Sequence, residues 1–458
     1  MALVDEQSCQ CSISPLEWFD VLPTQTAIEK SDWTEYTPVS PISDKSAVEF
    51  YIPPSTSEYI DLKNTYLYVQ FRIVKGDGTA LEETDKVAPI NDIFNGLWKN
   101  IELFLNDRLI YQSNNNHGYI SMIKNLLMDT EEYVTSQKSM QLFFKDTPGQ
   151  MDVTDPTLPN SSNLIPGWDS DIRGDLIDID ATVGNKGLHK RSTYTKASRV
   201  TDVLGPLSLD LFEQLKYLPN GIGIKLRLDR QKHKYVLMAA AGANYQLQLL
   251  SASLYVRKVF PNPGVMLGHG DALMKNNAKY PITRTVCKSM SLSKGHSTFK
   301  EDKVFLGQLP KRVIIGMVDE ESSTGSYIKN PYNFKLYNLS SISLSANGSP
   351  IAGSPLKVTN KCYGQCYKTL FSGLNKLDTD RGSIIKREDW ERGYALVAFD
   401  LTPDFDYEDH YSLVKYGNLK LELEFEEKVP CGVEILVFAQ FDNMIEINHN
   451  REIIFDYS

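Results

Sequence analysis

Two stretches of the chain alternate apolar and polar side chains with the two-residue period of a half-buried β-strand. The first reads GIGIKLRLDR from Gly221 to Arg230, and the second reads GNLKLELEFEE from Gly417 to Glu427. In both, every second side chain is aliphatic or aromatic and most of the intervening ones are charged. The chain therefore contains the same kind of strand twice, which suggests an internal duplication.

Further matched segments recur in the same order around these two strands. Each copy has a strand rich in β-branched and aromatic residues, then a strand that enters an Asn-Asp or Asn-Gly turn. A segment precedes each repeated strand and another strand follows it. The pairs are 65–74 with 311–318, 99–110 with 340–351, 207–215 with 397–405, and 245–259 with 432–447. Four matches in one order support the duplication better than any single match does.

The first copy is longer than the second. The offset between matched residues falls from 241 (Ile101 to Ile342) to 195 (Leu226 to Leu421), so the first copy holds 46 more residues. We place this insertion at residues 145–206, which are dense in Pro, Gly, Asp, Ser and Asn. Long loops in compact domains are normally functional or interfacial. We therefore predict that it forms outward loops that clasp a neighbouring subunit, with Leu164, Ile165 and Trp168 among its apolar anchors.

Many short strands with few helices predict an all-β fold of two tandem sandwiches or jelly rolls. Helical patterns are confined to residues 118–134, 263–277 and 387–392. We divide the chain into an N-terminal arm (1–44), a first jelly roll (45–258), a helical linker (259–279) and a second jelly roll (280–458). The arm has no detected counterpart in the second copy, and we expect its Phe19, Trp33 and Tyr36 to dock on a neighbour.

Composition narrows the function. The 458 residues suit two domains of about 200 residues, and the net charge of −10 disfavours a sequence-specific nucleic-acid binder. Two basic clusters, 188–199 and 227–235, are interpreted as solvated loops or subunit contacts. The N-terminus lacks a signal-peptide pattern and the longest apolar run, 236–243, is too short to span a membrane. Six unevenly spaced cysteines favour a reducing intracellular compartment.

No motif predicts an active site, a metal or a cofactor. The seven histidines are scattered, and neither Cys362 with Cys366 nor Cys9 with Cys11 has zinc-ribbon spacing. Residues 169–180 imitate the acidic positions of a calcium loop, but Arg173 stands where a ligand belongs. The acidic run 403–410 is interpreted as a solvated turn. A hydrolase whose active-site residues are scattered along the chain remains an alternative.

Long strings of this sequence resemble the major capsid proteins of Polinton/Maverick elements and the related adintoviruses. These strings are 19–42, 50–74, 278–295, 307–339, 393–405 and 438–457. The resemblance spans nearly the whole chain and is weakest over 145–199.

The resemblance implies a double jelly roll, in which two eight-stranded sandwiches stand side by side, perpendicular to a capsid surface. Three chains would form a pseudo-hexameric capsomer, and capsomers would build the icosahedral shell of a virion together with penton and minor capsid proteins. Such a protein needs no active site. The alternatives are a two-jelly-roll hydrolase or amidase and a carbohydrate-binding adhesin.

Overall fold

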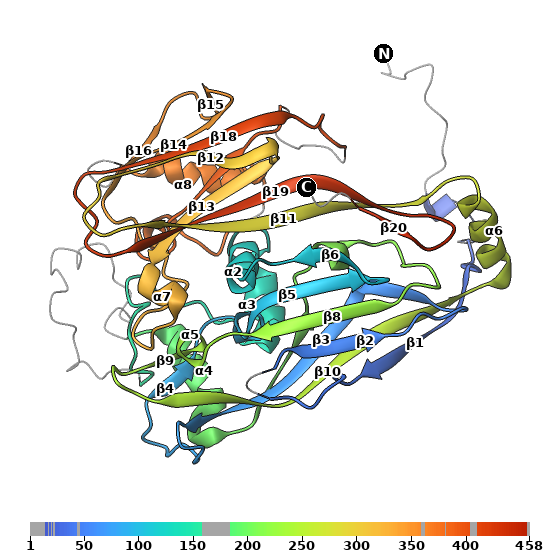
Figure 1. The fold of residues 1–458 in the computed structure, drawn as a ribbon, viewed down its shortest axis with the longest axis horizontal. Coiled ribbons are helices and arrows are strands. Elements are labelled where there is room, and N and C mark those ends of the chain that lie inside the picture. Colours follow the sequence, from blue (N-terminus) through green and yellow to red (C-terminus); the bar gives the residue numbers. More distant parts are fainter. Residues whose placement is uncertain are drawn as a thin grey trace.

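The computed structural model describes residues 14–16, 18–19, 21, 23–43, 46–157, 184–358, 362–380, 382–403 and 410–455. Two β-sandwiches lie next to each other, the N-terminal one below the C-terminal one in the view of Figure 1. Their strands pair in antiparallel fashion.

The first sandwich consists of two four-stranded sheets with the strand orders β1-β10-β3-β7 and β2-β8-β5-β6. The strands of the first sheet are β1 (Ile28–Tyr36), β3 (Tyr59–Lys75), β7 (Thr201–Pro206) and β10 (Tyr245–Pro261). Those of the second are β2 (Val48–Ile52), β5 (Trp98–Leu105), β6 (Arg108–Gln112) and β8 (Ile224–Arg230). A short pair, β4 (Val87–Pro89) with β9 (Leu237–Ala239), lies outside both sheets.

The second sandwich repeats this plan with the orders β11-β19-β13-β17 and β12-β18-β14-β15. Its first sheet contains β11 (Ala278–Leu292), β13 (Arg312–Asp319), β17 (Leu396–Asp400) and β19 (Val433–Ile447), with β20 (Ile453–Ile454) added on β19. Its second contains β12 (Thr298–Gln308), β14 (Leu339–Ala346), β15 (Ser349–Pro350) and β18 (Tyr416–Phe425), with β16 (Leu356–Lys357) on β14. Each sandwich thus has the eight main strands of a jelly roll, to which the second adds the short β16 and β20, and the fold is a double jelly roll, as the sequence predicts.

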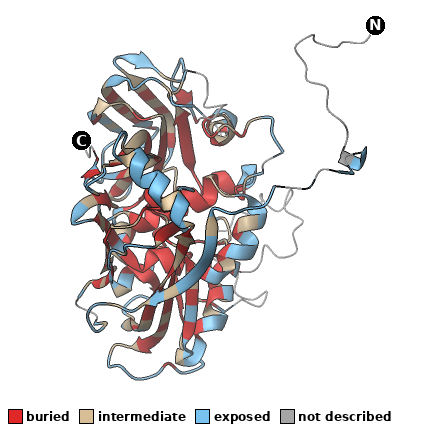
Figure 2. Ribbon diagram, turned by 90° about the vertical axis from the view of Figure 1, so that its right-hand side faces the viewer, coloured by how far each residue is buried: buried red, intermediate tan, exposed pale blue. Residues whose placement is uncertain are grey.

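The two strands that revealed the duplication occupy the same position in the two rolls. β8 lies between β2 and β5, and β18 lies between β12 and β14. The apolar face of each points into its core: Leu226 and Leu421 are both buried, while Glu422 is paired with Lys300 and Lys420 near the surface. Alternation in the sequence therefore gives the correct inward face. Figure 2 shows how the buried positions continue from one roll into the other.

The boundary of the predicted arm differs from the structure. Residues 28–36 are not part of a free arm: they form β1, which pairs with β10 from Ile28↔Pro261 to Tyr36↔Leu254. The same position in the second roll belongs to β11, which pairs with β19. The first jelly roll therefore begins at β1, and its counterpart in the second copy went undetected because the two strands share no side-chain pattern.

The insertion is also shorter than predicted. Its C-terminal end contains α4 (Lys186–Thr195) and then β7, a strand of the first sheet that pairs with β3. By position, β7 corresponds to β17, which pairs with β13. The match of 207–215 with 397–405 is therefore wrong, because 210–213 form a 3-10 turn, η6 (Asp210–Glu213), rather than a strand.

Helices connect and cover the sheets. The predicted helical stretches contain α2 (His117–Leu127), α3 (Glu131–Ser136), α6 (Pro263–Leu273) and α9 (Arg387–Trp390). Other short helical elements are η1 (Ser14–Leu16), α1 (Ile93–Gly96), η2 (Gln137–Gln141), η5 (Lys196–Ser198), α5 (His233–Val236), α7 (Glu320–Thr324) and α8 (Gly364–Ser372). α6 begins where the Asn262 side chain accepts the Gly264 N–H and Pro263 takes the first turn. It links β10 to β11 at one end of the molecule (Figure 1).

Replacing Leu421 or Leu226 by Asp should lower the free energy of unfolding by several kcal/mol, because either change buries an unpaired carboxylate in a jelly-roll core. Chemical denaturation measures this. Glu422→Gln, one position away on the outer face, should cost less than about 1 kcal/mol because it removes exposed pairing alone. Equal stability of the Leu421→Asp and Glu422→Gln proteins would contradict the assigned faces.

Candidate assembly site

Two features of the chain bear on its function: the junction that fixes one roll against the other, and the surfaces that are open to solvent. The buried apolar side chains of both rolls belong to one continuous cluster. Helix α2 lies at the junction, and all of its residues are buried. The junction is therefore a core in its own right.

Three tyrosines pack at the centre of the junction. Tyr119 comes from α2, Tyr235 from α5 and Tyr332 from the second roll, and each ring meets the other two edge to face at centroid distances of 6.0 to 6.4 Å. This T-shaped geometry is favourable for aromatic pairs. Burial raises the pKa of all three phenols, so they stay neutral. A Cβ on Gly118 would stand 2.7 Å from the Tyr332 hydroxyl oxygen, so glycine is needed for this close approach.

A fully buried ion pair ties the rolls together beside the tyrosines. Arg191 of α4 donates to the Asp146 carboxylate at 2.7 Å and to two backbone carbonyls of the first roll. From the second roll, Asn330 donates to the other Asp146 oxygen at 2.9 Å and the Tyr394 hydroxyl donates to the Asp146 carbonyl at 2.7 Å. Satisfied on every side, this pair avoids the penalty of an unpartnered buried charge.

Further polar contacts cross the junction at other points. Lys376 donates to the Leu127 carbonyl at 2.7 Å, and the Thr285 backbone N–H donates to Asp210 at 2.8 Å. At the far end, Arg108 donates to the carbonyls of Ile453 and Phe455. Because these contacts are spread along the junction, we conclude that the two rolls form one structural unit with a fixed relative orientation.

The carboxylate of Asp92 lies in a buried polar cluster next to the tyrosines. Its oxygens accept hydrogen bonds from Asn95, Ser121 and Asn125, and Asn95 in turn contacts His117. Burial raises the Asp92 pKa to about 6, although its hydrogen bonds and Lys138 act in the opposite direction. Burial lowers the His117 pKa to about 3, so that imidazole is neutral at physiological pH.

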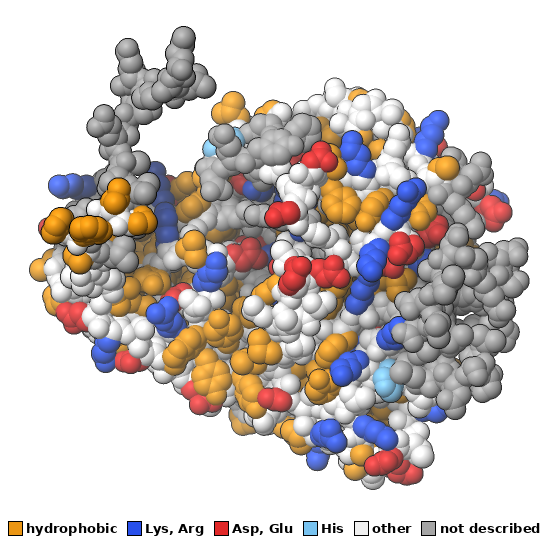
Figure 3. All heavy atoms as spheres, turned by 180° about the vertical axis from the view of Figure 1, so that it is seen from behind, with side chains coloured by type: hydrophobic (Ala, Val, Ile, Leu, Met, Phe, Trp, Pro, Cys, Tyr) orange, Lys and Arg blue, Asp and Glu red, His pale blue; other side chains and the backbone are white. Residues whose placement is uncertain are grey.

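The predicted contact residues fall in different places. Phe19 is 95% exposed, whereas Trp33 lies on β1 with its ring 5.7 Å from that of Tyr66. Tyr36, also on β1, is partly buried beneath the Lys258 ammonium. Figure 3, the view from behind, shows hydrophobic side chains gathered over the first roll, in the lower half of the picture. Leu164, Ile165 and Trp168 lie outside the described residues, as does the loop 169–180 considered for calcium.

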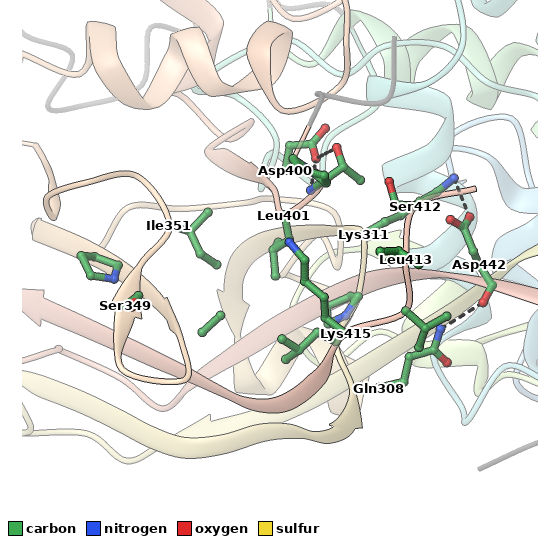
Figure 4. Close-up of a pocket in the computed structure, with 17 residues that line it drawn as sticks. Gln308, Lys311, Ser349, Ile351, Asp400, Leu401, Ser412, Leu413, Lys415 and Asp442 are labelled. Carbon is green, nitrogen blue, oxygen red and sulfur yellow. Dashed lines mark hydrogen bonds and ion pairs between the residues drawn. The ribbon is translucent and has the colours of Figure 1, made fainter. Parts of the chain in front are cut away.

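A groove on the second roll was not predicted. It consists of two adjoining pockets of about 350 and 560 Å³ that share Gln308, Ser412, Val414 and Asp442. Figure 4 shows the first pocket, with Ile351 and Leu401 on one side and the pair Lys311–Asp442 on the other. The sequence feature that could have predicted this groove is the run YSLVKYG (411–417), which contains four large apolar residues.

The two basic clusters combine partnered arginines with exposed lysines. Arg191, from the cluster 188–199, is fully buried, and Arg227 lies within 3.8 Å of carboxylate oxygens of Glu49 and Glu102 and 3.3 Å of one from Asp229. The segment 188–199 folds as helical turns against the first roll rather than as an irregular loop, while its Lys190, Lys196 and Arg199 are exposed to solvent, as expected. A basic residue in the sequence does not have to be exposed, because carbonyl and carboxylate groups can satisfy a buried arginine.

The described residues contain no group of three or more His, Cys, Asp or Glu placed to hold a metal ion. Within the same residues, no helix is both long and apolar enough to cross a membrane. Burial raises the pKa of the Cys287 thiol to about 12 and of Cys366 to about 11. Both thiols are therefore protonated and poor nucleophiles.

Comparison with known proteins gives relatives at low sequence identity and full-length structural matches. No family model matches the chain. An uncharacterized protein of Caenorhabditis elegans is 24% identical over 450 residues, covering 94% of this chain and 99% of the relative. Among solved structures, a chain of the Sputnik virophage matches with a TM-score of 0.63 and 12% identity, covering 98% of this chain and 94% of its own.

The mavirus major capsid protein matches with a TM-score of 0.55 and 11% identity, covering 100% of this chain and 97% of its own. The Faustovirus major capsid protein matches with a TM-score of 0.53 and 10% identity, with 94% and 92% covered. At these identities the shared property is the fold, and its extent over whole chains confirms the double jelly roll.

Replacing Gly118 by Val should destabilise the protein by about 1 to 3 kcal/mol, because the added methyl groups collide with the buried Tyr332 and Tyr235 hydroxyls. Thermal unfolding measures the change. The matched control is Gly268→Val on the exposed helix α6, where a Cβ meets nothing within 4 Å. If both variants melt alike, the junction is loosely packed, contrary to the geometry described.

The Asp92 carboxyl predicts a pH dependence of stability. Because its pKa in the folded protein is about 6, above the ordinary value of 3.8, its stabilising contribution is greatest at acid pH and is lost as pH rises through 6. Between pH 5 and pH 8 the parent should lose about 1 kcal/mol more than Asp92→Asn, which cannot titrate there. Denaturation at the two pH values measures this, and parallel curves would contradict the raised pKa.

Proposed function

We propose that this chain is a major capsid protein of the Polinton/Maverick and adintovirus group. Three chains associate into a pseudo-hexameric capsomer, and capsomers build the icosahedral shell of a virion. The observation that carries the proposal is the duplicated roll: each chain holds two sandwiches whose eight main strands follow the same order, in fixed orientation. Three chains then present six similar walls around a threefold axis, which approximates a hexagonal tile.

The comparisons support this function by fold. The mavirus and Faustovirus proteins that share the full-length double jelly roll carry the description of major capsid proteins. The long sequence strings that resemble Polinton/Maverick and adintovirus capsid proteins include 307–339 and 438–457, which contain β13 and most of β19. The protein is accordingly proposed to be structural rather than catalytic, with other copies of itself, penton proteins and minor capsid proteins as partners.

The open surfaces supply candidate contacts for this assembly. Trp33 and Tyr36 stand on the edge strand β1, and Phe19 is exposed beyond it. Aromatic side chains of this kind are enriched in protein interfaces because they bury large area at low entropic cost. The insertion anchors Leu164, Ile165 and Trp168 are proposed as trimer contacts on the sequence argument given above.

Purified protein should be trimeric by multi-angle light scattering and should form hexagonal-outline particles or closed shells in electron micrographs. Replacing residues 161–180 by a short Gly/Ser linker should leave the chain folded but shift the trimer toward monomer at concentrations where the parent is trimeric. A parent that stays monomeric and never forms shells would refute the proposed function. A shortened protein that remains a trimer with unchanged melting temperature would refute the role of the insertion.

A further inference from the structure

The groove of the second roll leaves large apolar side chains open to solvent. Leu413 is 90% exposed, Tyr416 is 74% exposed and Leu306 is 73% exposed, and all three line its pockets. They are contributed by adjacent chain segments, so they form one patch rather than scattered single residues. Contiguous exposed apolar surface of this kind marks an interaction site.

A second open apolar surface lies near the N-terminus, over residues 14–21, which we call the arm segment. Trp18 is 78% exposed, and Leu16, Phe19 and Val21 are also exposed. The one side-chain hydrogen bond found for its described residues is local, from the Trp18 indole N–H to the Pro15 carbonyl. Figure 2 shows η1 standing away from the body of the molecule. The arm segment therefore carries anchors without a surface to bury them.

The two surfaces suit each other in charge as well as in polarity. Glu17 and Asp20 flank the aromatic pair of the arm segment in the sequence. In the groove, Lys311 is already paired with Asp442 at 2.9 Å, whereas Lys415 is exposed and has no ion-pair partner in the part of the chain that the structure describes. An acidic, aromatic segment bound there would bring carboxylates toward the exposed Lys415 ammonium.

A single chain leaves both surfaces uncovered at once, so the groove is not filled by its own arm in this fold. From Ile28, the first residue of β1, the nine residues back to Phe19 extend at most about 30 Å, enough to cross to an adjacent molecule. When one patch on a molecule complements a different patch on the same molecule, identical copies join head to tail. Such contacts are the kind from which rings and shells are built.

We propose that the groove of the second jelly roll, lined by Leu306, Leu413, Val414 and Tyr416, binds the arm segment of a second copy of this chain. The inference rests on the proposed assembly function and names the partner surface that the aromatic arm uses. Trp18 and Phe19 are the anchors, and Lys415 receives the acidic residues beside them.

The first test measures binding without requiring shells. The receptor is full-length protein carrying Trp18→Ser and Phe19→Ser, so that its own arm does not compete, and the probe is a fluorescent peptide of residues 12–25. Fluorescence anisotropy should show saturable binding, at least tenfold weakened by adding Val414→Asp to the receptor. The matched control, Leu267→Asp on exposed α6, should leave binding unchanged. Absence of binding, or binding insensitive to Val414→Asp, overturns the inference.

The second test asks whether the arm comes from another copy. Chains carrying Phe19→Cys and chains of different mass carrying Leu413→Cys, both in a Cys9→Ser, Cys11→Ser and Cys362→Ser background, are mixed and oxidised. A disulfide-linked pair of unlike chains is the expected product. If a chain carrying both cysteines forms an internal link and unlike chains do not join, the groove takes its own arm and the inference fails. Peptide binding in a parent that builds no shells would instead count against the proposed function alone.

Discussion

The buried junction between the two rolls is the constraint on which the rest of the structure depends. A jelly roll buries its own core between its two sheets and can fold without a partner domain. Two jelly rolls joined only by a linker would therefore rotate freely relative to each other. Here the Asp146 carboxylate accepts hydrogen bonds from Arg191 of its own roll and from Asn330 of the other roll. Three tyrosines pack edge to face next to them. Separating the rolls would remove the Asn330 and Tyr394 hydrogen bonds from Asp146 and pull Tyr332 away from Tyr119 and Tyr235, which makes partial opening costly.

A fixed junction turns the duplicated fold into one rigid block, which is what the proposed capsomer requires. Because the relative orientation of the two rolls is set inside each chain, contacts between chains in the proposed trimer need only repeat one geometry to close a ring. The polar contacts of the junction are widely separated: Lys376 contacts the Leu127 carbonyl beside α2, and Arg108 contacts the C-terminal segment at the far end. Contacts at both places hold the orientation better than contacts at one place would. In the proposed shell, a junction held at one point would let the rolls rotate slightly, and these errors would accumulate from subunit to subunit.

Much of this fold follows from the sequence, and the failures have physical reasons. Strands buried on one face, such as β8 and β18, alternate clearly and were placed correctly. β1 was missed as a sheet strand because it is largely exposed on both faces and has no alternation to detect. β7 is short and ends in Gly-Pro, so it read as loop. The tyrosines of the junction come from distant segments, and no local sequence pattern predicts that they are in contact.

The exposed edge of β1 bears on how copies of the chain would recognise one another in the proposed assembly. β1 is an edge strand of its sheet, and it carries Glu29, Lys30, Asp32 and Glu35. Charges on an edge discourage another strand from adding by backbone hydrogen bonds, which would otherwise proceed without limit. Specificity at this edge must then come from side chains such as Trp33, whose ring packs on Tyr66 and still exposes half its surface. A subunit that assembles by side-chain complementarity stops at a closed shell, whereas one that assembles by open strand pairing grows into a fibre.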